Sequence, residues 1–168
     1  MQFHSTLSLP AIRAAQLRHV ANEKNATSAD IIDSFIRAAW TDVGGGVVLP
    51  GFDFVACLDD DSGEPVVTFV CTGSLPVLLK PEQAHGVANG IRDLLAAVAA
   101  RFEVDAICEG SRARFIGTRK GRGFTIQLLD DLDDPGRKPV TLLGLTASIA
   151  ADLADTFETF AKRAEALR

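Results

Sequence analysis

The first residues of the chain alternate between mainly apolar and polar side chains. Residues 2–9 divide at every second position into two sets, Phe3, Ser5, Leu7 and Leu9, and Gln2, His4, Thr6 and Ser8. Successive side chains of an extended chain point to opposite faces, so a period of two is typical of a half-buried strand. The pattern therefore predicts a short strand over residues 2–9.

Two helices are predicted after this strand. The first begins at Pro10, because proline favours the first helical position, and it ends near Asn25, which tolerates a left-handed backbone. Thr27 and Asp30 have the spacing of a capping box and predict the start of the second helix. Apolar side chains recur at helical spacing in both, at Ile12, Leu17, Val20 and Ala21 and at Ile31, Ile32, Phe35, Ile36 and Trp40.

Three consecutive glycines at residues 44–46 predict a flexible linker. We therefore expect a small module over residues 1–43 and a second domain over residues 47–168. In the second domain, apolar β-rich runs predict strands over residues 52–58, 65–72, 76–80, 106–109, 114–118, 124–129 and 140–145. Helical spacing predicts helices over residues 81–98 and 146–166.

The two helices of the second domain match each other at an offset of 66 residues. The matched pairs are Leu79 and Leu145, Ala84 and Ala150, Val87 and Leu153, Ile91 and Phe157, and Leu94 and Phe160. Each helix follows a group of strands, so residues 47–104 and 105–168 are interpreted as two similar halves, although any two amphipathic helices match at some offset. The expected fold class is α+β, with a βαα module followed by an antiparallel-sheet domain of two strands-then-helix halves.

The small module cannot bury enough surface alone, and a single strand cannot form a sheet. A homodimer in which two copies of residues 3–9 pair as an antiparallel ribbon solves both problems. Residues 3–40 resemble the ribbon-helix-helix family of repressors, to which Arc and MetJ belong. The resemblance rests on Thr6-Leu7-Ser8-Leu9-Pro10, Leu17, Ala21, Asn25-Ala26-Thr27-Ser28 and Ile31-Ile32.

The resemblance implies binding to double-stranded DNA. In that family the ribbon lies in the major groove, and its outward side chains, here His4, Thr6 and Ser8, read base edges. The turn and the start of the second helix hold a phosphate, which here involves Asn25, Thr27 and Ser28. The family usually has glycine at the turn and Arg or Lys on the ribbon, so we expect modest affinity and several dimers side by side. The alternatives are dimerisation alone and another fold such as a helix-turn-helix.

The charged residues are unevenly distributed, and one segment of the second domain is a further candidate for binding nucleic acid. The formal net charge is −5, which disfavours a protein that coats nucleic acid through bulk charge. Residues 47–104 carry three basic and eight acidic groups, whereas one short segment of the second domain is strongly basic: Arg112, Arg114, Arg119, Lys120 and Arg122.

Three interpretations of this basic segment remain open. Arg112 and Arg114 share a strand face, and residues 117–123 have the composition of a hairpin tip, so the segment is a candidate surface for single-stranded or double-stranded nucleic acid. The repeated strands-then-helix order also looks like whirly-type single-strand-binding proteins. Alternatively, the basic side chains protect a solvated sheet edge, or they pair with acidic groups of residues 47–104 or of a protein partner.

No catalytic constellation is found in the sequence, so we expect neither an enzyme nor a cofactor. A nucleophile elbow, a P-loop, His-x-x-x-His and paired Cys-x-x-Cys motifs are absent. His4, His19 and His85 lie far apart without carboxylates at ligand spacing, and the acidic segments 59–61 and 130–134 lack the spacing of a calcium loop, so no metal is expected. Cys57, Cys71 and Cys108 are interpreted as buried thiols.

The sequence favours a cytoplasmic DNA-binding transcriptional regulator of repressor type. No apolar run is long enough to span a membrane, and the first ten residues are too polar for a signal peptide. The second domain is expected to control DNA binding by oligomerisation, a ligand or a partner. The alternative is an antitoxin, an adaptor or a DNA-processing accessory factor whose second domain binds a protein or single-stranded nucleic acid.

Overall fold

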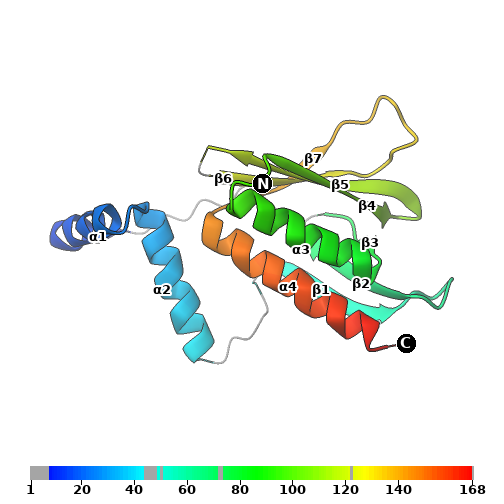
Figure 1. The fold of residues 1–168 in the computed structure, drawn as a ribbon, viewed down its shortest axis with the longest axis horizontal. Coiled ribbons are helices and arrows are strands. Elements are labelled where there is room, and N and C mark those ends of the chain that lie inside the picture. The colour runs from blue at the N-terminus through cyan, green and yellow to red at the C-terminus, as the bar shows by residue number, and fades with distance from the viewer. Residues whose placement is uncertain (1–7, 44–48, 50, 72–73, 122, 168) are drawn as a thin grey trace. The chain divides into compact units, whose positions relative to one another are not determined.

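The computed structural model describes residues 8–43, 49, 51–71, 74–121 and 123–167. The chain divides into two compact units, Met1–Gly44 (unit 1) and Gly45–Arg168 (unit 2). The division falls at the glycine run where the sequence predicts a linker, and the linker itself lies outside the described residues. The elements of both units are labelled in Figure 1.

Unit 1 contains two helices, α1 (Ala11–Glu23) and α2 (Ser28–Asp42). Asn25 in the turn between them has a φ of 49°, the left-handed conformation expected at this position. The predicted capping box is confirmed, because the Thr27 hydroxyl accepts a hydrogen bond from the Asp30 N–H at 3.1 Å and the Asp30 carboxylate accepts one from the Thr27 N–H at 2.8 Å.

The expected ribbon strand is not supported by the described part of unit 1, where helices come first. Ser8, Leu9 and Pro10 have no regular secondary structure and are exposed, and the rest of the predicted strand lies outside the described residues. A strand needs a partner strand for its backbone hydrogen bonds, and residues 8–43 of one copy, which form two helices, offer none. Pro10 precedes the first helix as its N-cap instead of occupying its first turn.

Unit 2 is built on one seven-stranded antiparallel sheet whose strands follow the chain in the order β1-β2-β3-β4-β5-β6-β7. The strands are β1 (Phe52–Leu58), β2 (Pro65–Cys71), β3 (Val77–Leu79), β4 (Arg101–Cys108), β5 (Ser111–Lys120), β6 (Gly123–Leu129) and β7 (Val140–Leu145). The α+β class and the antiparallel sheet are therefore confirmed.

Two helices, α3 (Pro81–Leu95) and α4 (Ala147–Glu165), pack side by side on one face of this sheet (Figure 1). Helix α3 contacts mainly β4 and β5, whereas α4 returns to β1 and β2. Between the helices and the sheet lies an aromatic core in which Phe69, Phe115 and Phe157 are fully buried. Strand side chains alternate between this core and the opposite, outer face of the sheet.

The two predicted halves of unit 2 share the order of strands followed by a helix, and the duplication itself stays a prediction. In each half the helix begins one residue after a strand, after Lys80 in the first half and after Thr146 in the second. The positions matched by the offset of 66 residues point into the same core, since Ala84, Val87 and Ile91 are buried in α3 and Ala150, Leu153 and Phe157 are buried in α4. Strand β4 precedes the other strands of the second half and has no counterpart in the first.

Two details of the strand prediction are wrong. Strand β4 begins at Arg101, whereas the predicted strand begins at residue 106. The prediction missed the first part of the strand because charged residues at alternate positions on the outer face obscure the apolar positions of the inner face. Gly117 does not belong to a hairpin tip: it lies inside β5, paired with Phe102, and the turn begins only after Lys120. The Phe102 ring occupies the space of the missing Gly117 side chain, since an added Cβ would lie 2.0 Å from its Cε1.

Candidate nucleic-acid interface

Ser8 is the described member of the predicted base-reading set, and it is exposed. His4 and Thr6 lie outside the described residues. The base-reading assignment of His4, Thr6 and Ser8 therefore stays a prediction.

The start of α2, predicted to hold a phosphate, is organised by its capping box. The Thr27 hydroxyl donates to Asp30 at 2.7 Å and also accepts from the Asp30 N–H, so this hydroxyl is already engaged. The N–H groups of Ser28 and Ala29 in the first turn have no hydrogen-bond partner in the described part of the chain. These N–H groups can receive a phosphate oxygen, but the Asp30 carboxylate beside them weakens the attraction for an anion.

Unit 1 leaves an unusual amount of apolar surface open. Ile12 is 70% exposed, Phe35 is 69% exposed and Ile36 is 60% exposed. Further exposed apolar side chains are Leu9, Val20, Trp40 and Val43. The buried apolar side chains in the described part of unit 1 are Ala21 and Ile31. Two helices with so little core require another surface to cover them.

The basic segment does not form one surface. Strand alternation places Arg112 and Arg114 on the outer face of β5, whereas Arg119 lies on the helix-facing side. The Arg119 Nη1 donates to the Leu94 carbonyl at 3.1 Å, and its guanidinium lies 5.8 Å from the Phe124 ring centroid. Lys120 is the last residue of β5, and its side chain lies outside what the structure describes, as does Arg122.

The two outward arginines already have acidic partners. Arg114 donates to Asp105 at 2.8 Å and to Glu103 at 3.1 Å, and hydrogen bonding to Asp105 raises the pKa of its guanidinium. Glu103 also accepts from Arg101, which lowers the pKa of that carboxyl. Arg112 lies 3.5 Å from Asp133 but remains 70% exposed. The pairing of Arg114 with Glu103 fits the interpretation that the segment pairs with acidic groups of residues 47–104. Strand β5 lies between β4 and β6, so it is not a sheet edge, and the nucleic-acid surface stays a prediction.

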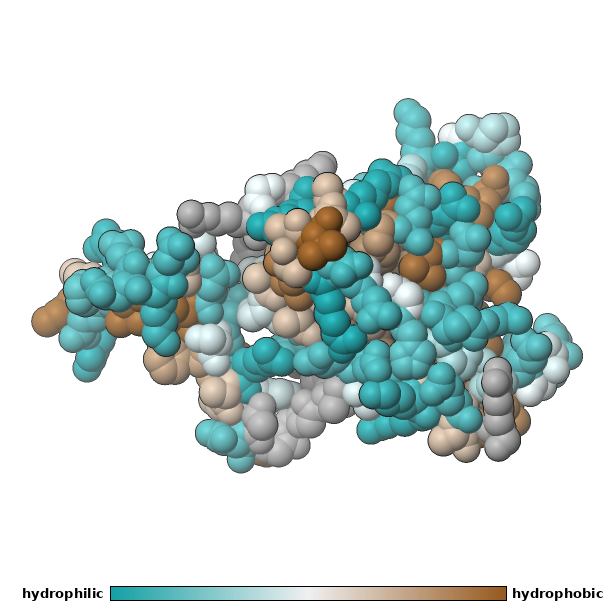
Figure 2. All heavy atoms as spheres, in the orientation of Figure 1, coloured by the Kyte–Doolittle hydropathy of each residue, from teal (hydrophilic) through white to brown (hydrophobic). Residues whose placement is uncertain are grey.

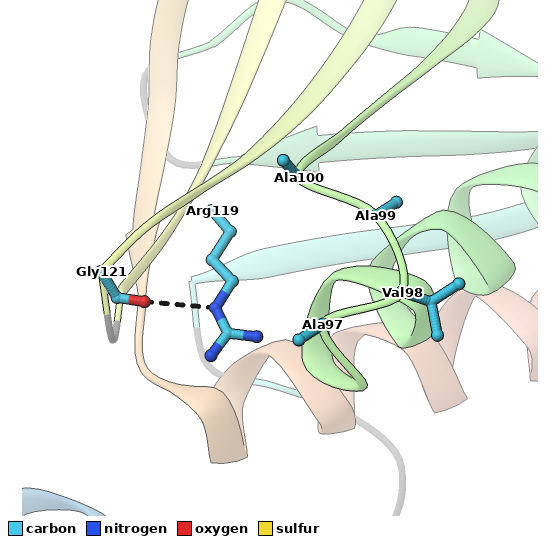
Figure 3. A pocket seen from close by; sticks show the side chains of 6 residues that line it. All are labelled: Ala97, Val98, Ala99, Ala100, Arg119 and Gly121. Atoms are coloured by element: carbon cyan, nitrogen blue, oxygen red, sulfur yellow. Dashed lines mark hydrogen bonds between the residues drawn. The ribbon is translucent and has the colours of Figure 1, made fainter.

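A pocket of about 470 Å³ lies at the end of α3 (Figure 3). Its lining residues are Ala97, Val98, Ala99, Ala100, Arg119 and Gly121. The Arg119 guanidinium is its charged group, and the Nε and Nη1 atoms of that group already donate to the Gly121 and Leu94 carbonyls. Among the lining residues that the structure describes there is no carboxylate, histidine or nucleophilic side chain.

One polar cluster was missed by sequence reasoning. His85 on α3 lies 3.0 Å from Glu158 through Nδ1 and 3.2 Å from Glu165 through Nε2, both on α4. Sequence spacing gives no sign of this cluster, because the packing of α3 on α4 brings together residues far apart in the chain. Glu158 also accepts from Lys162 and Arg92, and hydrogen bonds from Lys162 and His85 lower the pKa of Glu158 to about 2.

The described residues contain neither a metal site nor a membrane-spanning helix. No group of three or more His, Cys, Asp and Glu side chains there is arranged to hold a metal ion. None of the helices in that part of the chain has the length and apolar character needed to cross a membrane. Comparison of the chain with protein-family models, curated proteins and solved structures gives no match.

Proposed function

We propose that the protein is a homodimeric, sequence-specific double-stranded DNA-binding transcriptional regulator. Unit 1 dimerises and binds DNA, and unit 2 controls binding through further assembly. The observation that carries the proposal is the apolar surface of α1 and α2, which is exposed in a single copy while Ala21 and Ile31 alone are buried in the described part of unit 1.

A second copy of unit 1 is the natural cover for this surface. The exposed side chains, such as Ile12, Phe35 and Ile36, come from both helices. Burial of one large apolar side chain contributes roughly 1.5–3 kcal/mol, so a two-fold contact between such faces supplies the core that each copy lacks. In the proposed dimer, the predicted strand of one copy would pair with that of the other.

DNA binding is supported by the resemblance of residues 3–40 and by the geometry of the turn. Asn25 has the left-handed backbone that the family's glycine would adopt, and the N–H groups of Ser28 and Ala29 have no partner in the described part of the chain, which leaves them able to receive a phosphate oxygen. The Asp30 carboxylate and the absence of Arg and Lys from residues 2–9 limit affinity. We therefore expect base contacts to matter more than charge.

The test is selection of bound duplexes from random DNA by the full-length protein, followed by gel retardation. Recovered sites should contain short inverted or direct repeats. Thr6→Ala should weaken binding to the selected site about 5- to 150-fold, which corresponds to roughly 1–3 kcal/mol, and should leave binding to random DNA nearly unchanged.

Ser5→Ala is the matched control, because residue 5 falls on the opposite face of the predicted strand. It should leave specific binding nearly intact if the protein stays folded. Recovery of no shared sequence, or an equal loss for Thr6→Ala on selected and random DNA, would contradict the proposal.

A further inference from the structure

The surface at the end of α3 differs from the rest of the helical face of unit 2. Hydrophilic residues predominate over α3 and α4, but apolar residues gather beside the end of α3 (Figure 2). Residues 97–100, which lead from α3 into β4, are all alanine or valine, and Val98 is 76% exposed. These four residues line one side of the pocket in Figure 3.

Arg119 lines the pocket opposite this apolar wall and is held in place by three contacts. Its Nη1 donates to the Leu94 carbonyl, its Nε donates to the Gly121 carbonyl at 3.2 Å, and its guanidinium lies near the Phe124 ring. These contacts fix the planar guanidinium, which extends toward Ala97 (Figure 3). Its third nitrogen, Nη2, has no hydrogen-bond partner in the described part of the chain. A positioned cation therefore keeps unused donors at the pocket.

The polar groups of the pocket match a single negative charge. The described lining residues include one cation, Arg119, and no carboxylate. The Ala100 N–H, just before β4, has no hydrogen-bond partner among the described residues and adds a neutral donor. One guanidinium neutralises one carboxylate, whereas a phosphate dianion carries more charge and more acceptor oxygens than these donors can satisfy. A carboxylate attached to an apolar group is therefore the ligand chemistry that fits both sides of the pocket.

The backbone at the pocket is strained. Ala97 has a φ of 57°, at a position after the helix where glycine is the usual residue. Its methyl group lines the pocket (Figure 3), so a glycine there would remove the strain and part of the apolar wall together. Backbone strain of this kind is concentrated at functional sites, where the surrounding structure holds the residue in place.

We propose that the pocket of unit 2 binds a small organic carboxylate with a short apolar group. The carboxylate accepts hydrogen bonds from the Arg119 guanidinium and the Ala100 N–H, and the apolar group covers Val98. The pocket volume of about 470 Å³ is within the range of roughly 300–1,000 Å³ found for small-molecule sites. The site goes beyond the proposed function, because binding here requires neither DNA nor the unit 1 dimer. A measurement without DNA therefore tests it separately.

The experiment is an NMR titration of the full-length protein, without DNA, with hexanoate and benzoate as probes. Both acids should bind, and the neutral hexanamide and benzamide should bind at least about tenfold more weakly, because they lack the charge that pairs with Arg119. Inorganic phosphate, which has no apolar group, should bind more weakly than either acid. Amides that bind as tightly as the acids, or the absence of binding by both acids, would overturn the inference.

Variants locate the bound probe. Arg119→Gln should weaken hexanoate binding at least about tenfold.

Val98 provides a second test that leaves Arg119 and its contacts intact. Val98→Lys should tighten hexanoate binding and Val98→Glu should weaken it, each about two- to fivefold, as expected for an exposed charge beside the ligand. The same two substitutions at Val55 are the matched control, because Val55 is 53% exposed on the edge strand β1, and they should leave binding unchanged. A folded Arg119→Gln protein that binds like the wild type, or equal binding by the two Val98 variants, overturns the inference.

Discussion

At the scale of single residues, Ala97 is held in a backbone conformation that favours glycine. Helix α3 ends with the Val98 N–H donating to the Asp93 carbonyl and the Ala97 N–H donating to the Leu94 carbonyl, the two bonds of a Schellman motif. The residue in the left-handed position of this motif is Ala97, with a φ of 57°. An alanine there is strained by its Cβ.

Ala97→Gly should therefore raise the free energy of unfolding, by about 0.5–1 kcal/mol after the greater freedom of glycine in the unfolded chain is counted. Ala96→Gly is the control, because Ala96 has an ordinary right-handed backbone with a φ of −73°. That variant should lose stability. Urea denaturation of both variants checks the pair, and a loss of stability for Ala97→Gly would show that the strain is absent.

A second residue-scale prediction compares two glycines of α3. An added Cβ at Gly90 would lie 2.4 Å from Cγ of Phe102, whereas one at Gly86 would lie 3.4 Å from Cγ2 of Val104. Gly90→Ala should therefore cost about 1–3 kcal/mol through overpacking. Gly86→Ala should be neutral or gain up to about 1 kcal/mol, because alanine favours a helix.

Thermal unfolding of the two variants provides the measurement. Gly90→Ala should lower the midpoint of thermal unfolding, whereas Gly86→Ala should raise it or leave it unchanged. Equal shifts would mean that α3 does not approach β4 more closely at Gly90 than at Gly86.

At the scale of elements, the pairing of α3 with α4 depends on pH through Glu158. Lys162 and His85 lower the pKa of this carboxyl from 4.5 to about 2 in the folded protein. A carboxyl whose pKa is lowered by folding stabilises the fold above its unfolded value and loses that contribution as the pH falls through the folded value.

Glu158→Gln should accordingly reduce stability at neutral pH by at most about 1 kcal/mol, since its partners are partly exposed. The difference from wild type should shrink between pH 4.5 and about 2. Denaturation measured across this range is the check, with Glu82→Gln on the exposed start of α3 as control. A constant difference at all pH values would contradict the assignment.

The elements of unit 2 were largely predictable, because local pattern decides them. Strand β1 and strand β7 have the predicted bounds, and Pro81 and Thr146 mark the starts of α3 and α4 as expected. The pattern could not predict tertiary contacts between residues that lie far apart in the sequence. Gly117 looks like a turn residue until Phe102 is placed over it, and nothing near His85 in the sequence points to Glu158.

The candidate interface was predictable only where short-range geometry governs it. The capping box at Thr27 and the left-handed Asn25 depend on neighbours within a few residues. The surroundings of the basic segment were harder to predict. Arg114 and Arg119 lie on opposite faces of β5, and the partner of Arg114, Asp105, comes from the adjacent strand β4. Pairing across strands cannot be read from the order of charges alone.

At the scale of the whole molecule, folding of unit 1 should depend on protein concentration. Trp40 is the one tryptophan of the chain, so its fluorescence reports on unit 1. If unit 1 folds only as a dimer, its unfolding midpoint should rise with concentration, because association stabilises the folded state. Ile36→Lys should lower the midpoint and remove the concentration dependence.

Ser34→Lys is the control for this prediction, because helical spacing places Ser34 on the side of α2 away from Ile32 and Ile36. It should behave like the wild type. A midpoint independent of concentration in the wild type would mean that one copy of unit 1 is stable alone.

The return of α4 to the first strands has a consequence for synthesis on the ribosome. Strands that pair with their chain neighbours can join the sheet in the order in which they emerge, but α4, which covers β1 and β2, emerges last. Until it does, the ring of Phe54, which packs 4.9 Å from that of Phe157, has no cover from α4. A nascent or truncated chain lacking its last twenty or so residues would therefore display an aromatic surface of the kind that chaperones and proteases recognise in unfinished proteins.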